Sequence, residues 1–139
     1  MVYSDIFRLH PLPTTVDREA SLRCIAECLD CIAGCTACAD DCLSEPDLPE
    51  LVRCVRLDLD CADICDATAR VVARQTELNL RVIRTLVESC AAACVACADE
   101  CDRHAAMHEH CRLCAQMCRR CQHACDDLLA TIGPRLDTP

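Results

Sequence analysis

The sequence contains no lysine, and its aromatic residues are a single tyrosine and a single phenylalanine. It also has only two glycines. A chain so poor in residues that favour strands is not expected to form a β-sheet. Its hydrophobic content of 53% is too high for a disordered chain. The composition therefore predicts an all-α protein, and the length of 139 residues predicts a single domain.

Since lysine is absent, all 14 basic side chains are arginine, and 23 acidic residues outnumber them. This acidic balance argues against binding to nucleic acid. A long apolar run is also missing from the first 22 residues, where the segment from Ile6 to Leu9 is short and contains Arg8. We therefore expect neither export nor membrane insertion. The expected location is the cytoplasm, where cysteines remain reduced.

Cysteine is abundant, with 18 residues, and most of them recur every three or four positions along four stretches. This is the spacing of one face of an α-helix, and the alternating steps form a heptad pattern. Asp58 occupies one position of the pattern in the second stretch. The cysteines are Cys24, Cys28, Cys31, Cys35, Cys38 and Cys42, then Cys54, Cys61 and Cys65, then Cys90, Cys94, Cys97 and Cys101, and finally Cys111, Cys114, Cys118, Cys121 and Cys125.

Prolines and capping residues place the expected helix ends. Four helices of about 25 residues with short connections predict an antiparallel up-down four-helix bundle over about residues 15–132. A short N-terminal arm, residues 1–14, completes the single domain 1–139. The predicted helices run from Thr14 or Thr15 to about Leu43, from Pro49 to about Arg74, from Thr76 to about Arg103, and from a start within residues 104–110 to about Ile132, before Gly133-Pro134.

The two ends of this bundle are expected to differ. At one end the cysteine pattern gives way to one threonine and six apolar residues, which are Thr68, Val72, Leu80, Ile83, Val87, Leu128 and Ile132. At the other end the pattern of the third helix continues to His104, and Met107, His108 and His110 follow at once. The sequence therefore predicts a cysteine-lined core that is closed by apolar residues at one end and opens among histidines and a methionine at the other.

Four side chains outside the pattern also need a place. Tyr3 and Phe7 lie in the arm, which we expect to cover a second apolar stripe of the first helix. The same stripe could instead pack against another subunit. Its residues are Leu22, Ile25, Leu29 and Ile32. Met117 flanks the cysteine positions of the fourth helix, as a packing residue or a ligand. His123 lies on the outward side of the same helix, where we expect it to be solvated.

Ordinary uses of cysteine fit the pattern poorly. Alanine, leucine or valine would fill so many core positions without reactive thiols. Cysteines three or four apart on a helix have Cβ atoms about 5–6 Å apart, farther than the roughly 3.5–4.5 Å that a disulfide needs. Redox Cys-x-x-Cys motifs accompany a βαβ pattern, which this sequence lacks. Asp58 is not core filler either, since an unpaired buried charge is costly. Metal binding remains.

Charge selects the metal. Thiolates and thioethers favour Cu(I), zinc or iron–sulfur clusters. Filling the core with four-thiolate zinc sites would bury about eight uncompensated charges. Cu(I) carries one charge and accepts bridging thiolates, so 18 thiolates and Asp58 predict about 19 Cu(I) ions per chain. Iron–sulfur clusters use compact four-cysteine groups, typically in loops, and suit long helical patterns poorly.

The spacing Cys24-x3-Cys28-x2-Cys31-x3-Cys35-x2-Cys38-x3-Cys42 and its repeats resemble the cytosolic branch of the four-helix-bundle copper storage proteins, over roughly residues 17–132. The resemblance implies a homotetramer that stores or sequesters Cu(I) and catalyses no reaction. It implies that all 18 cysteines bind metal. The accessory ligands that it implies are Asp58, His104, Met107, His108 and His110.

We expect a cytosolic copper chaperone or a low-molecular-weight thiol to deliver Cu(I) to the end that carries the histidines. Ligand exchange between thiols would then move each ion inward. The alternative is a zinc or cadmium buffer of the metallothionein type, which would hold far fewer ions. A thiol redox enzyme, the third hypothesis, would need an exposed thiol of low pKa.

Overall fold

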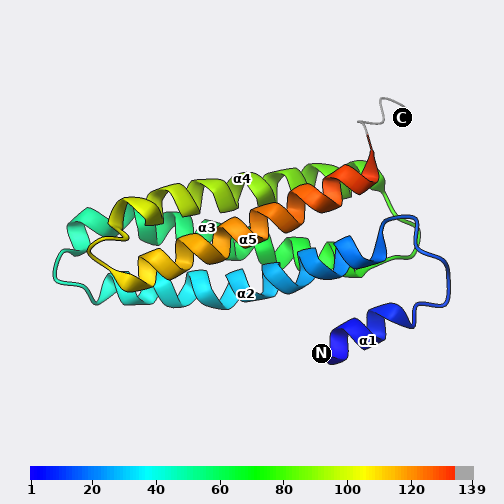
Figure 1. Cartoon of the computed structure of the whole chain (residues 1–139), viewed down its shortest axis with the longest axis horizontal. Coiled ribbons are helices and arrows are strands. Elements are labelled where there is room, and N and C mark those ends of the chain that lie inside the picture. Colours follow the sequence, from blue (N-terminus) through cyan, green and yellow to red (C-terminus); the bar gives the residue numbers. More distant parts are fainter. Residues whose placement is uncertain (134–139) are drawn as a thin grey trace.

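Four long helices form an antiparallel bundle, and a short fifth helix lies beside it (Figure 1). The computed structural model describes residues 1–133, in which the secondary structure is entirely helical. Residues 134–139, with Pro134 and the end of the predicted domain, lie outside the described residues. The helices are α1 (Val2–Arg8), α2 (Arg18–Leu43), α3 (Leu48–Ala73), α4 (Leu80–His104) and α5 (Glu109–Ile132). The predicted all-α four-helix bundle is confirmed.

The connections alternate between the two ends of the bundle. Helix α2 packs against α3 and α5, and α4 packs against the same two helices. The α2–α3 and α4–α5 connections lie at one end, and the α3–α4 connection lies at the other (Figure 1). We term the first the histidine end, formed by residues 44–47 and 104–110, and the second the apolar end. This is the predicted up-down order.

Two helices begin later than predicted. The Asp17 carboxylate caps α2 by accepting a backbone N–H at 2.8 Å, so the proposed caps Thr14 and Thr15 lie outside the helix. The Asn79 side chain caps α4 in the same way at 3.1 Å, in place of Thr76. Aspartate and asparagine are at least as favourable N-caps as threonine. Where several capping residues follow one another, the route of the preceding loop decides which of them is used.

The N-terminal arm contains α1, a helix that the sequence analysis did not predict, and it folds back beside α2 (Figure 1). Phe7 is buried and Tyr3 is partly buried against the core. Leu22 and Ile25, from the second apolar stripe of α2, are buried in the same cluster. The arm thus packs on α2, the helix that carries the stripe, although Leu29 of the stripe is 37% exposed.

Apolar side chains close the apolar end as predicted. Val72, Ile83, Val87 and Leu128 are all buried there, together with Thr68. None of the helices within residues 1–133 combines the length and the apolar character needed to cross a bilayer. The bundle therefore has a core whose chemistry changes along its axis, from aliphatic carbon at one end to sulfur over most of its length.

Candidate metal centre

The cysteines of all four long helices point into the bundle and form a continuous column of sulfur, which we term the thiol column. All 18 are buried free thiols. Cys38 and Cys114 are 3% and 4% exposed, and each of the other cysteines has no exposed surface. The predicted cysteine-lined core is therefore confirmed, and the heptad spacing explains it because each long helix turns one face towards the bundle axis.

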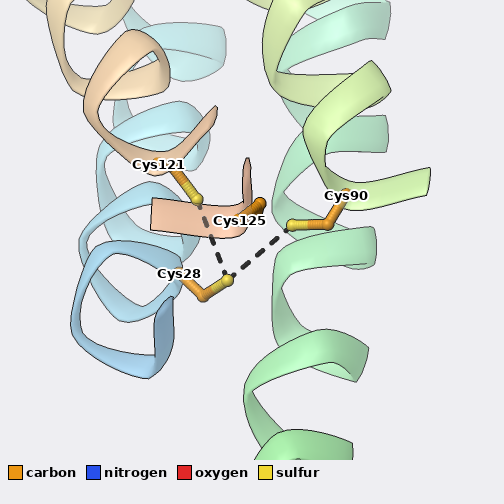
Figure 2. Close-up of side chains that lie close together, drawn as sticks. All are labelled: Cys28, Cys90, Cys121 and Cys125. Atoms are coloured by element: carbon orange, nitrogen blue, oxygen red, sulfur yellow. Dashed lines mark hydrogen bonds between the residues drawn. The ribbon is translucent and has the colours of Figure 1, made fainter. Parts of the chain in front are cut away.

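Contacts between sulfur atoms join the helices to one another. Figure 2 shows Cys28 of α2 between Cys90 of α4 and Cys121 of α5, with Sγ–Sγ distances of 3.7 and 3.8 Å. Cys65 of α3 lies 3.7 Å from Cys90 and 4.0 Å from Cys121. Cys28, Cys90 and Cys121 form a group with Cys125, in which all four sulfur atoms lie within 4.8 Å of one another. One cross-section of the core thus draws sulfur from every long helix.

Such groups repeat along the axis, and they share members. Further groups with all their sulfur atoms within 4.8 Å include Cys31/Cys65/Cys94/Cys121, Cys31/Cys35/Cys61/Cys118, Cys35/Cys97/Cys114/Cys118 and Cys38/Cys42/Cys54/Cys111. Cys31, Cys35, Cys118 and Cys121 each belong to at least two groups. A sulfur with two such sets of neighbours is placed to bridge two metal ions. The column therefore suits bridged clusters better than separate four-thiolate sites.

Asp58 lies inside the thiol column and has no exposed surface. Its Oδ1 accepts hydrogen bonds from the thiols of Cys97 at 3.0 Å and Cys114 at 3.3 Å. Burial raises the pKa of this carboxyl to about 9, and the neighbouring Cys114 adds to the shift. The carboxyl is therefore neutral near pH 7, which avoids the cost of an unpaired charge in the core.

Hydrogen bonding distributes the protons of the thiol column unevenly. Hydrogen bonds with Cys121 and Cys125 raise the pKa of Cys28. Hydrogen bonds from Cys125 and Cys28 lower the pKa of Cys24 to about 5. At the opposite end of α2, burial raises the pKa of Cys42. Neighbouring thiols therefore differ in how readily they release a proton to a metal ion.

His110 is the histidine that contacts the thiol column. Its Nδ1 lies 3.4 Å from the sulfur of Cys38 and 3.6 Å from that of Cys111, and its Nε2 lies 3.3 Å from a Glu45 oxygen. The sequence analysis placed His110 near the cysteine pattern but not on it. Side chains lean towards the N-terminus of their helix, so His110, in the first turn of α5, reaches the end of the column.

The other histidines of this end are held by carboxylates. His104 lies on the cysteine pattern, but its Nε2 bonds to Glu100 at 2.8 Å. The Nε2 of His108 lies 2.9 Å from Asp47, and this hydrogen bond raises the pKa of His108 and lowers the pKa of Asp47. Met107 points outward, with 78% of its surface exposed.

The histidine end is covered rather than open. Cys42, Cys54 and Cys111 have no exposed surface, and His108 is only 9% exposed. Leu51, three residues before Cys54 in α3, is fully buried. The sequence analysis missed the three carboxylates, Glu45, Asp47 and Glu100, that hold the histidines. The predicted topology could have indicated Glu45 and Asp47, because the 44–47 connection lies at the same end of the bundle as the 105–108 connection.

Two further expectations concern α5. His123 is exposed, as predicted for the outward side of the helix. Met117 is 8% exposed and packs over Gly34 of α2, where a Cβ atom would overlap its Sδ and Cε atoms. Its thioether thus lies at the α2/α5 interface, beside the thiol column.

Comparison with known proteins gives consistent matches. A family model described as copper storage protein matches residues 17–130. The copper storage protein Ccsp of Streptomyces lividans, loaded with 10 copper equivalents, is 54% identical and has a TM-score of 0.91, covering 93% of this chain and 98% of its own. The Cu(I)-bound copper storage protein BsCsp3 of Bacillus subtilis is 35% identical with a TM-score of 0.70, covering 79% of this chain and 98% of its own.

A curated relative is also similar to this chain. The cysteine-rich protein YhjQ of Bacillus subtilis is 38% identical over 107 residues, which are 77% of this chain and 94% of the relative. The matched family model covers nearly the whole bundle, from the cap of α2 to the end of α5. This chain therefore belongs to the copper storage protein family.

Proposed function

We propose that this protein stores or sequesters Cu(I), about one ion per cysteine, in the thiol column, and that it catalyses no reaction. The observation that carries the proposal is the continuity of the column. Its 18 thiols are buried, and neighbouring sulfurs approach to 3.6–4.0 Å across all four long helices. The relatives loaded with copper support the same metal.

Shared cysteines favour Cu(I) over a divalent ion. Cys31 and Cys35 each belong to at least two groups of sulfurs. A zinc ion in every group would have to share thiolates and would leave net negative charge in a low-dielectric core. Cu(I) is coordinated by two or three thiolates, which can each bridge two ions, and it replaces one proton for each positive charge. The zinc or cadmium alternative has no support from the comparisons.

The proposed ligands fall into two sets. All 18 cysteines bind copper in the column, Asp58 contributes an oxygen ligand within it, and His110 contributes Nδ1 at its end. His104, Met107 and His108 form a capture layer at the histidine end. Their position supports this role. Glu100 orients the ring of His104, Asp47 orients the ring of His108, and Met107 presents an exposed thioether. Carboxylates commonly orient metal-binding imidazoles in this way.

We further propose a cytoplasmic setting, where reduced thiols persist. A relative described as a cytosolic copper storage protein supports this. A cytosolic chaperone or a low-molecular-weight thiol would supply the copper. We also propose the homotetramer that the family resemblance implies.

Copper capacity tests the proposed function. Anaerobic titration of the reduced protein with Cu(I), in competition with a chromophoric chelator, is expected to reach a plateau at about 18–19 ions per chain, because charge neutrality requires one ion per buried anion. Protein alkylated at its cysteines under denaturing conditions is the control and should withhold no copper. A plateau at about four or five ions would instead fit separate tetrathiolate sites.

In the copper-free state, the stability of Asp58→Asn relative to wild type is expected to increase as the pH rises. The carboxyl has a pKa of about 9 in the folded chain, above its unfolded value. Between about pH 4 and 9 the unfolded chain therefore releases a proton that the folded chain keeps, and stability falls by up to about 1.4 kcal/mol per pH unit. Asparagine does not titrate, so urea unfolding of Asp58→Asn should show a flatter dependence on pH.

The matched control for this variant is Asp63→Asn, which removes an exposed carboxylate from the same helix. It should keep the wild-type pH dependence. If Asp58→Asn and wild type lose stability in parallel between about pH 5 and 7.5, Asp58 is not protonated in the folded chain.

His110→Ala is expected to weaken copper binding at the cluster of Cys38, Cys42, Cys54 and Cys111. The affinity of the protein for the copper ions of this cluster should fall at least about tenfold, because losing even an outer partner of a metal ligand typically costs that much. Chelator competition during stepwise loading measures this. His123→Ala removes an exposed histidine from the same helix and should behave as wild type. Equal chelator curves for both variants would show that His110 is not a ligand.

A further inference from the structure

A groove of about 310 Å³ lies on the side of the bundle between α2 and α5. Its lining includes Cys38 and Cys114, the two cysteines that retain exposed surface, at 3% and 4%. The other cysteines, including those beneath the histidine end, have none. Solvent therefore reaches the thiol column through the side of the bundle and not through the end that carries the histidines.

The groove is also lined by a thioether and an imidazole. Met117 and His110 line it together with the two cysteines. Gly34 of α2 leaves the space that the Met117 thioether occupies, since a Cβ atom there would overlap Sδ and Cε. Glycine weakens the interior of a helix relative to alanine. Its position in the middle of α2 is explained by the methionine that it admits.

The groove leads directly to the middle of the thiol column. The sulfur of Cys114 lies 3.9 Å from that of Cys35 and 3.3 Å from Oδ1 of Asp58. The sulfur of Cys35 lies 3.6 Å from that of Cys118. An ion bound at Cys114 is thus one ligand exchange away from the central groups. An ion that enters at the histidine end must first pass the cluster of Cys38, Cys42, Cys54 and Cys111.

A second groove shows that these donors are not a general feature of helix interfaces. It lies between α3 and α4 and has a similar volume, about 330 Å³. Its lining is mostly aliphatic, with Leu57, Ile64 and Ala92 among its residues, and it contains no cysteine, methionine or histidine. This second groove provides a matched control for the first.

We propose that the α2/α5 groove is the main access site, faster than the histidine end, where a small Cu(I)–thiol complex exchanges copper with the thiol column. The proposal rests on the copper storage function above. The exchange involves no change of oxidation state. The bond from copper to the carrier sulfur breaks, a bond from copper to the sulfur of Cys114 or Cys38 forms, and the proton of that cysteine passes to the carrier thiolate, which leaves as a thiol. Met117 and His110 are neutral donors that hold the ion during transfer.

Filling the groove tests this route. Ala37 is exposed on α2 and lines the groove, so Ala37→Phe covers it without touching the buried sulfurs. The control is Ala92→Phe, which places the same side chain in the α3/α4 groove. The measurement is anaerobic stopped-flow loading with Cu(I)–glutathione, followed by thiolate-to-copper absorption in the near ultraviolet. Circular dichroism checks that both variants fold.

Ala37→Phe is expected to slow loading at least about tenfold, because a factor of ten corresponds to only about 1.4 kcal/mol of added barrier. Ala92→Phe should load at the wild-type rate, and both variants should keep the wild-type capacity. Equal rates for the two variants at full capacity would overturn the access site alone. A capacity of only four or five ions in all three proteins would instead overturn copper storage.

Thiol labelling of the wild-type protein tests the same inference without a variant. Iodoacetamide at a low ratio to protein, followed by mass spectrometry of peptides, should label Cys38 and Cys114 first. First labelling of Cys42, Cys54 or Cys111 would show that the histidine end is the accessible one and would overturn the proposal.

Discussion

Electrical neutrality of a buried sulfur core is the constraint on which the rest of this structure depends. A thiolate or carboxylate without a counter-charge is costly in a low-dielectric interior. In the copper-free protein, protons meet most of this requirement, and the raised pKa of Asp58 illustrates it. Cu(I) meets it as well, since each ion brings one positive charge and displaces one proton. The same core can therefore be empty or filled without a large imbalance of charge.

Neutrality also explains why the bundle is able to fold before it binds metal. Protonated cysteine behaves as a small hydrophobic residue, so the heptad pattern buries it as it would bury leucine or alanine. Aliphatic residues such as Val87 and Leu128 complete the core at the apolar end. Copper then adds stability by binding the folded state in preference to the unfolded one. Zinc fingers differ, because their folding requires the metal.

The bundle and the thiol column follow from the sequence because both depend on periodicity, which is local. The steps between Cys24 and Cys42 define a helix face without reference to any other segment. The choice of cap at Asp17 or Asn79 and the helix in the arm depend on how loops run, so they could not be predicted in this way. The same limit applies to the histidines. His104 has the right periodicity but bonds to Glu100, whereas His110 contacts the sulfurs through its position at the start of α5.

The side groove was also beyond prediction from the sequence. It requires the pairing of Gly34 with Met117, which are far apart in the chain and meet only when α2 packs against α5. Methionine beside a cysteine pattern was compatible with packing or with metal binding. The packing around Gly34 places the thioether where the thiol column has exposed sulfur. Position across the bundle, rather than residue type, separates these two roles.

Proton release during copper binding tests the central claim of neutrality most directly. Cu(I) would be added as its acetonitrile complex, which carries no basic ligand, to the reduced protein in weakly buffered solution under anaerobic conditions, and the protons released would be recorded for each ion. The account predicts about one proton per Cu(I) at every stage until the column is full, since each ion replaces one proton in the core. A ratio of two or more protons per ion, with saturation at fewer than half as many ions as cysteines, would mean that the loaded core carries a large negative charge and would contradict the account.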